Sequence, residues 1–237
     1  MSPAFDGIEA CVFDAYGTLL DFNSAADQAR DVLGTRAEKL SDLWRSKQVQ
    51  YTWLRSLMGA YVPFWQVTGE ALDYALETLQ IDDPALRSRL MNLYQQLSPF
   101  ADAAPALREI RALGYKTGIL TNGSPEMIVT GCQHAGLSGL LDLILSVAEV
   151  GVFKPHPSVY ELAEKRFGVR REHIAFVSSN GWDAAGAAHF GFRVAWCNRY
   201  DQRPEQLPGQ PHAVIQSLAQ LPRLLRRGGG ADDLADL

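Results

Sequence analysis

The sequence predicts an α/β fold: a Rossmann-like, doubly wound parallel sheet with an all-helical segment inserted after the first strand. Three observations support this expectation. Short apolar runs recur along the 237-residue chain, amphipathic stretches lie between most of them, and one long segment near the start has helical spacing without any strand-like run. In sheets of this kind, ligands bind at the carboxyl ends of the strands.

Five strands are expected, each a short apolar run that ends at a small or polar residue. They cover residues 8–13, 116–120, 143–147, 174–177 and 193–196. Amphipathic helices are expected between them, over residues 126–135, 157–167 and 183–190. Alternation of strands and helices at this spacing is typical of a parallel sheet that carries helices on its faces.

The inserted helical segment covers residues 23–97. Aromatic and aliphatic residues recur in it at helical spacing, among them Trp44, Val49 and Trp53. Residues 1–22 and 98–226 then form the sheet domain, to which the chain returns at Ser98-Pro99-Phe100. The stretch 201–212 holds three prolines and is expected to be a loop, and residues 227–237 are expected to be a disordered tail.

Composition excludes several classes of function. The net charge of −5 argues against nucleic acid and against anionic membranes as partners. No apolar run approaches the roughly 18 residues of a membrane span, and the N-terminus lacks the pattern of a secretory signal. The three cysteines are scattered, as expected of buried thiols in a reducing compartment. A cytoplasmic protein is therefore expected.

Polar residues follow the ends of four expected strands. An acid at a strand end is, taken alone, often only a helix cap. All four groups together, in this order, are hard to obtain by chance, and the sheet would bring them to one rim. They are Asp14 after the first strand, Thr121-Asn122 after the second, Lys154 after the third, and Ser178, Asn180 and Asp183 after the fourth.

This layout resembles the haloacid dehalogenase superfamily, in which Asp-x-x-Gly-Thr, Thr/Ser-Asn, Lys-Pro and an acidic fourth motif occur in this order. Residues 24–97 fall where that superfamily inserts its helical cap. The match is closest to the L-2-haloacid dehalogenases and covers nearly the whole chain except the C-terminal tail. The strings that carry it are FDAYGTL, LWRSKQVQYTWLRSLMGAYVPFW, LTNGS, VFKPHPSVYE and VSSNGWDAAGAAHFGF.

Tyr16 sets this sequence apart from the phosphatases of the superfamily. Those enzymes carry a second aspartate at this position and more acids in the fourth motif, and together these hold Mg²⁺. The metal offsets the repulsion between a carboxylate and a phosphate. Here Asp14 and Asp183 alone make a poor Mg²⁺ site. Halide departure needs no proton and the attacked carbon carries no charge, so neither a metal nor another cofactor is expected.

The resemblance implies that Asp14 is a nucleophile. Its carboxylate displaces the halide from the substrate carbon, and water then attacks the ester carbonyl of Asp14, so the substrate carbon inverts once. Lys154 would keep Asp14 ionised. Ser178, Asn180 and Asp183 would orient Lys154 and the hydrolytic water, with Asp183 as either water activator or anchor. The implied partners are a 2-haloacid, water and halide.

Arg45 lies one helical turn before Val49 on the apolar stripe, where a charge needs a partner. Periodicity alone also fits an arginine whose head reaches solvent at the edge of the stripe. The resemblance implies that Arg45, Asn122 and Trp182 cradle the halide. It further implies that substrate contacts come from Ala15, Tyr16, Thr18, Val49, Phe64, Thr121 and Tyr160. The five histidines show no ligand spacing, so catalysis without a histidine base is expected.

Alternatives stay open at this point. A phosphatase of the same fold would need Mg²⁺, and Tyr16 argues against it. A catalytically idle relative that binds small carboxylates would have lost Asp14, Lys154 or Arg45, and all three are present. Halogen preference, including fluoride or haloacetates, is not readable. The family often forms homodimers through cap helices, and residues 51–65 fit either such an interface or the core of the cap.

Overall fold

The six strands form one parallel sheet in the computed structural model, which describes residues 4–228. The order across the sheet is β3-β2-β1-β4-β5-β6. Their bounds are β1 (Ala10–Phe13), β2 (Lys116–Thr121), β3 (Leu143–Ser146), β4 (Ile174–Ser178), β5 (Arg193–Cys197) and β6 (Ala213–Ile215). The predicted doubly wound α/β fold is confirmed, and all five expected strands are present.

Strand β1 lies at the centre of the sheet, paired with β2 on one side and β4 on the other. The chain builds outward through β2 and β3, then returns to the far side of β1 and builds outward through β4, β5 and β6. The strand order therefore reverses at β1 and β4. All the residues of these two strands are buried, as continuous apolar runs in a sheet covered on both faces should be. Ligands bind at such a switch point.

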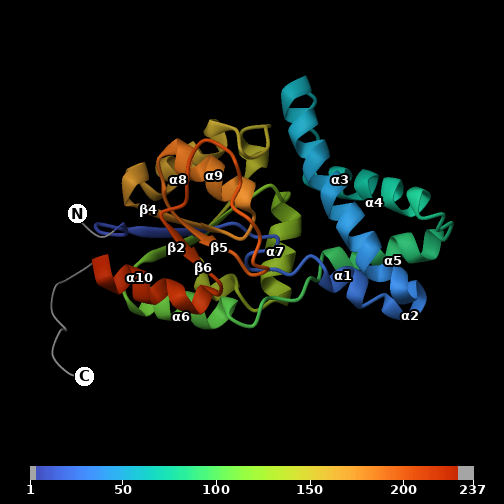
Figure 1. Cartoon of the computed structure of the whole chain (residues 1–237), viewed down its shortest axis with the longest axis horizontal. Coiled ribbons are helices and arrows are strands. Elements are labelled where there is room, and N and C mark those ends of the chain that lie inside the picture. Colours follow the sequence, from blue (N-terminus) through green and yellow to red (C-terminus); the bar gives the residue numbers. More distant parts are fainter. Residues whose placement is uncertain (1–3, 229–237) are drawn as a thin grey trace.

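Helices cover both faces of the sheet (Figure 1). Helices α8 (Pro157–Phe167) and α9 (Gly181–Phe190) lie above it in this view, and α6 (Ala103–Ala112) and α10 (Leu221–Gly228) lie below. Helix α7 (Pro125–His134) follows β2. The loop expected at 201–212 contains no helix or strand. Helix α10 includes the first two residues of the tail expected at 227–237, and the others lie outside the described residues.

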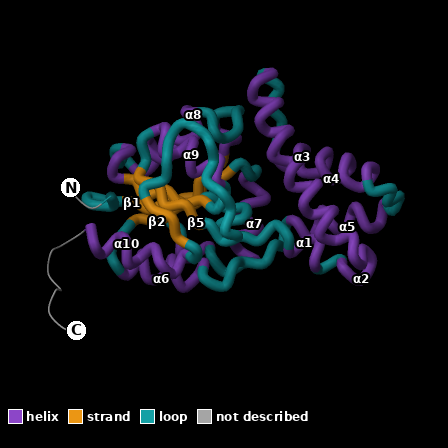
Figure 2. Tube along the Cα trace, in the orientation of Figure 1, coloured by secondary structure: helices purple, strands orange, loops and turns teal. Residues whose placement is uncertain are grey.

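The inserted segment contains helices and no strand among its residues, as predicted. Figure 2 shows it as a purple body to one side of the orange sheet. The long helix α3 and helix α4 pack against each other along this body. Its helices are α1 (Ser24–Asp27), α2 (Arg30–Leu33), α3 (Ala37–Met58), α4 (Phe64–Thr78) and α5 (Pro84–Tyr94).

The second half of α3 carries several exposed apolar residues. The apolar residues of its second half were expected to form either an interface or the core of the cap, and in the single chain Trp53, Leu54, Leu57 and Met58 are exposed, Leu57 by 85%. The buried face instead carries Trp44 together with polar residues. Helix α3 therefore buries a partly polar face and leaves an apolar end uncovered in the single chain.

Three elements of the sheet domain were not predicted: helix α6, strand β6 and helix α10. Helix α6 follows the return from the insertion, and its buried stripe consists of Ala103, Ala106, Leu107 and Ile110. Strand β6 is three residues long and forms one edge of the sheet. Strand β6 is too short to present an apolar run, whereas helix α6 was not predicted although its apolar residues recur at helical spacing.

Candidate active site

Asp14 directly follows β1, at the switch point of the sheet. Its backbone N–H still donates to the carbonyl of Val177 in β4, at 2.9 Å. A tight turn follows, in which the carbonyl of Ala15 accepts the N–H groups of Thr18, Leu19 and Leu20. Gly17 in this turn has a φ of +91°. Since that φ lies in the left-handed region, glycine suits it. The turn holds the Asp14 carboxylate at the rim, with 6% of the residue exposed.

The carboxylate of Asp14 has three partners. Its Oδ1 lies 3.0 Å from Nζ of Lys154. Its Oδ2 accepts from Nδ2 of Asn180 at 2.8 Å and from the hydroxyl of Thr18 at 3.2 Å. Both oxygens are thus held by donors from two other strand ends and from the turn after Asp14 itself, and the predicted convergence of strand ends at one rim is what the structure shows.

Lys154 lies between two carboxylates. Its ammonium is 2.9 Å from Oδ2 of Asp183 and is 1% exposed, while Asp183 is completely buried. Burial alone would lower the pKa of Lys154, but the charges of Asp14 and Asp183 raise it above its ordinary value. Lys154 is therefore a charged ammonium near neutral pH.

Asp183 is held on both oxygens. Besides Lys154, the hydroxyl of Tyr160 donates to its Oδ1 at 2.8 Å. Burial raises the pKa of Asp183, and the Lys154 ammonium counteracts part of that shift. Tyr160 was expected to line the pocket, but its side chain is fully buried, and it contacts Asp183 instead. Its position suits a residue that orients Asp183.

Ser178 and Asn180 form a short hydrogen-bond chain that ends at Asp14. The hydroxyl of Ser178 accepts the backbone N–H of Asn180 at 3.1 Å. The Asn180 amide donates to Asp14 and to the carbonyl of Tyr16, and its Oδ1 accepts from Arg45 at 3.1 Å. These two residues were expected to orient Lys154. The structure shows Asn180 contacting Asp14 and Arg45, and Ser178 contacting the backbone of Asn180. Of Ser178, Asn180 and Asp183, only Asp183 bonds Lys154.

Arg45 reaches from helix α3 of the insertion to Asn180 of the sheet domain. Besides Asn180, its guanidinium donates to the side chain of Gln48 at 2.8 Å, and it lies over the ring of Phe22 at 5.0 Å. The expected partner for a charge on this stripe is therefore present. Asn180 bonds both Arg45 and Asp14, so a single side chain connects the positive charge of Arg45 to the carboxylate.

Gln48 was not recognised in the sequence. It is fully buried, and its amide N–H groups contact the hydroxyls of Thr68, at 2.8 Å, and Tyr94, at 3.1 Å. Because its Oε1 accepts from Arg45, this network holds the arginine from behind. Its signal in the sequence was weak: a polar residue one turn after Trp44 on the face of α3 that turned out to be buried.

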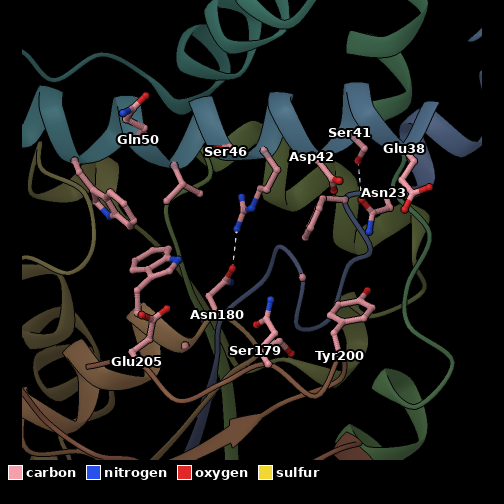
Figure 3. A pocket seen from close by; sticks show the side chains of 18 of the residues that line it. Asn23, Glu38, Ser41, Asp42, Ser46, Gln50, Ser179, Asn180, Tyr200 and Glu205 are labelled. Carbon is pink, nitrogen blue, oxygen red and sulfur yellow. Dashed lines mark hydrogen bonds between the residues drawn. The ribbon is translucent and has the colours of Figure 1, made fainter. Parts of the chain in front are cut away.

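A cleft of about 1020 Å³ lies between helix α3 and the loops that follow β4 and β5. In Figure 3, α3 crosses above, with Asp42, Ser46 and Gln50, and Ser179 and Asn180 lie below. The expected wall residue Val49 lines it. Trp182 also lines it and meets Trp53 of α3 edge-on, with ring centroids 5.3 Å apart. The cleft thus borders Arg45 and Asn180.

Other predicted site residues lie around Asp14 but not on the surface of this cleft. The amide oxygen of Asn122 accepts the backbone N–H of Lys154 at 3.0 Å, which leaves its amide N–H groups as the available donors. The hydroxyl of Thr121 accepts the N–H of Gly123 at 3.0 Å and is fully buried. Phe64 is 1% exposed and packs against Tyr16, with ring centroids 5.7 Å apart.

Tyr16 contributes an aromatic wall where the phosphatases have an acid. Its ring stacks on Tyr94 at 5.6 Å, and burial raises the pKa of its phenol well above the ordinary value. The phenol is therefore neutral. The residues present do not fit the Mg²⁺ site of the superfamily, because position 16 carries this phenol in place of the second acid and the described residues hold no cluster of three candidate metal ligands.

Comparison with known proteins agrees with this geometry. Residues 8–191 match the family described as haloacid dehalogenase-like hydrolase. The chain is 44% identical to (S)-2-haloacid dehalogenase 1 of Pseudomonas sp. (strain CBS-3), over 94% of this chain and 98% of that protein. It is 40% identical to haloacetate dehalogenase H-2 of Moraxella sp. (strain B), over 92% and 98% of the two chains.

A solved structure with a similar fold supports the same family. The L-2-haloacid dehalogenase of Xanthobacter autotrophicus with chloropropionic acid covalently bound superposes with a TM-score of 0.87 at 40% identity, covering 92% of this chain and 98% of that one. In the described part of this chain, no helix is long and apolar enough to cross a membrane. The fold, the motif order and these similarities together show that the chain belongs to the haloacid dehalogenase-like hydrolase family.

Proposed function

We propose that the protein hydrolyses short-chain L-2-haloalkanoic acids to 2-hydroxy acids, with inversion, through an ester on Asp14. The observation that carries the proposal is the Asp14 carboxylate, held at the switch point by Lys154 and Asn180 and facing no second acid at position 16. Relatives of over 40% identity named (S)-2-haloacid dehalogenases support it, as does the related structure with chloropropionic acid covalently bound.

In the first step, a carboxylate oxygen of Asp14 forms a bond to carbon 2 of the substrate, and the halide leaves with the electron pair of the carbon–halogen bond. Charge therefore develops on the halogen. Arg45, Asn122 and Trp182 are proposed to receive it, because a guanidinium, an amide N–H and a ring edge are all electropositive. Thr18, Ala15 and the backbone N–H groups near Thr121 would position the acid and its carboxylate.

In the second step, water attacks the carbonyl carbon of the Asp14 ester. The ester bond to Asp14 breaks at that carbon, so the hydroxy acid keeps the oxygen that came from Asp14. Lys154 would stabilise the negative charge that forms on the tetrahedral intermediate. Asp183, held by Lys154 and Tyr160, is proposed in one of two roles, as acceptor of the water proton or as the anchor of Lys154.

The function is tested by measuring halide release from L- and D-2-chloropropionate in the presence of EDTA. The L isomer should react, the D isomer should not, and EDTA should leave the rate unchanged because no step uses a bound cation. A phosphate ester with Mg²⁺ serves as the control. Hydrolysis of the phosphate ester alone would replace this proposal with a phosphatase, and binding of the haloacid without turnover would indicate an idle relative.

A haloacetate preference is the second candidate, favoured by the relative named haloacetate dehalogenase H-2. It predicts that chloroacetate or fluoroacetate has a higher kcat/KM than L-2-chloropropionate in the same halide assay.

The domain division is proposed as a core of residues 1–22 and 98–226 and a cap of residues 23–97. Three buried, free cysteines among the described residues support a reducing, cytoplasmic location.

We also propose that the chain forms a homodimer through the end of helix α3. Leu54, Leu57 and Met58 are exposed there, which is unusual for apolar side chains so close together. Sedimentation equilibrium should give twice the mass of the 237-residue chain, and Met58→Glu should shift it to the monomer mass while halide release continues. A monomeric wild type at assay concentration would contradict this.

A further inference from the structure

Arg199, two residues after β5, ties three separate segments together. Its guanidinium forms two bonds to the carboxylate of Asp102, at 2.8 and 2.9 Å, and donates to the backbone carbonyl of Thr18 at 2.9 Å. It also lies over the ring of Phe100, with Cζ 4.1 Å from the centroid. Only about a tenth of the Arg199 side chain is exposed.

Asp102 is itself fixed by its surroundings. The hydroxyl of Ser217 and the backbone N–H of Leu218 donate to the same carboxylate, at 2.7 and 2.9 Å. Burial alone would raise the pKa of Asp102, but these bonds and Arg199 lower it below the ordinary value. The pair therefore stays ionised at neutral pH, and a bidentate arginine–carboxylate contact of this kind has little freedom to move.

The carbonyl that Arg199 holds belongs to a residue that contacts Asp14. The hydroxyl of Thr18 donates to Oδ2 of Asp14 at 3.2 Å and accepts the backbone N–H of Ser179 at 2.8 Å. Phe100, under the guanidinium, donates its N–H to the carbonyl of Leu19 at 3.0 Å. Arg199 thus supports the turn after Asp14 from one side, while Phe100 connects that turn to the chain returning from the helical insertion.

We propose that Arg199, paired with Asp102, is a positioning residue for the nucleophile. By fixing the backbone at Thr18, it holds the Thr18 hydroxyl on Asp14 and so sets the direction in which the free carboxylate lone pairs point. Arg199 touches neither substrate nor the reacting atoms. The inference rests on the proposed displacement by Asp14, because it assigns a role in aligning that attack. Loss of alignment lowers the rate of attack more than it weakens substrate binding.

The chain offers a control built from the same contacts elsewhere. Arg171 pairs with Glu164 at 2.8 Å, lies over the ring of Phe190 at 4.2 Å and donates to the carbonyl of Phe190 at 3.3 Å. None of these three residues bonds Asp14 or Thr18, although Phe190 packs against Tyr160, with ring centroids 5.7 Å apart. Arg171→Met and Arg199→Met therefore remove the same kinds of contact, and only the second should affect Asp14.

The test is kcat and KM for halide release from L-2-chloropropionate, with each variant assayed well below its own Tm. Arg199→Met should lower kcat by about tenfold to a hundredfold and change KM by less than about threefold. Arg199→Lys keeps the positive charge but cannot form both bonds to the Asp102 carboxylate in the same geometry. Its kcat should therefore lie between those of Arg199→Met and wild type. Arg171→Met should keep the wild-type kcat.

Three results would overturn the inference: a kcat of Arg199→Met within about twofold of wild type, an equal loss in Arg171→Met, or a loss that appears in KM alone. If Arg199→Met does not fold, Arg199→Lys and Asp102→Asn are judged by the same criteria. Wild-type protein that releases no halide would instead overturn the proposed function, and this inference with it. An active wild type with an unaffected Arg199→Met overturns the inference only.

Discussion

Asp14→Asn should abolish halide release, with a loss in kcat of at least about 10⁴-fold. The amide keeps the shape of the carboxylate, but it is neutral and cannot supply the attacking electron pair at a useful rate. Two of the three partners of Asp14, Asn180 and Thr18, donate hydrogen bonds that an amide oxygen can still accept. The fold should therefore persist, and circular dichroism and Tm would check that it does.

The matched control is Asp73→Asn. Asp73 is an exposed carboxylate paired with Arg87 on the helical insertion, away from the strand ends. It should leave kcat unchanged, since surface pairs contribute little. Substantial halide release by Asp14→Asn would mean that another group or an activated water displaces the halide, and the proposed ester would then be wrong.

Heavy-oxygen water tests the same step in the wild-type protein. With enzyme in excess over L-2-chloropropionate, one turnover should place the label in the Asp14 carboxylate, because water attacks the ester carbonyl. The hydroxy acid of that first turnover should be unlabelled, since its new oxygen comes from Asp14. Mass spectrometry of the peptide that contains Asp14 measures this, and label found in the product alone would exclude the ester.

The sequence predicted the parts of the fold that depend on long apolar runs or strong helical spacing. Buried central strands such as β1 and β4 are apolar along their whole length, so they were visible. Helix α6 was not predicted although Ala103, Ala106, Leu107 and Ile110 recur at helical spacing. Strand β6 was missed because a three-residue edge strand buries too little apolar surface to produce a pattern. Short elements of this kind are stabilised by tertiary contacts rather than by their own sequence.

The rim of the sheet was predictable because the strand ends converge there in any parallel sheet. The direction of each polar contact was not. Ser178 and Asn180 were expected to orient Lys154. Instead, the Ser178 hydroxyl accepts the backbone N–H of Asn180, and the Asn180 side chain bonds Asp14 and Arg45. Which donor meets which acceptor depends on side-chain rotamers and on the turn after β1, and neither has a signature in the sequence.

Helix α3 shows why the residues behind the site were missed. Its aromatic and aliphatic residues suggested the buried face, but the structure buries Gln48, which holds Arg45 through a hydrogen bond. A polar residue can be buried where its partners come from other helices, here Thr68 of α4 and Tyr94 of α5. Those partners lie 20 and 46 residues away along the chain, so spacing within α3 alone could not indicate them.

Lys154→Met should both inactivate and destabilise the protein. Without the ammonium, Asp14 and Asp183 face each other with no compensating charge, in a site where Lys154 is 1% exposed and Asp183 completely buried. Removing one partner of a buried ion pair costs about 3–5 kcal/mol of the free energy of unfolding. Urea denaturation would measure this loss. Lys165→Met, which removes an exposed lysine paired with Glu161 on helix α8, should leave the stability nearly unchanged.

The pH dependence of this loss separates an electrostatic cause from lost packing. Since the folded protein raises the pKa of Lys154, its stabilisation is fully present below the ordinary lysine value of 10.5 and is lost as the pH rises through the folded value. In Lys154→Met, burial raises the pKa of Asp183 without the opposing ammonium, so protonation favours the folded variant as the pH falls. The stability difference between wild type and variant should therefore be larger at about pH 8 than at about pH 5. An equal difference at both pH values would assign the loss to packing of the lysine stem, and Lys154 would no longer serve as the charge that keeps two carboxylates together.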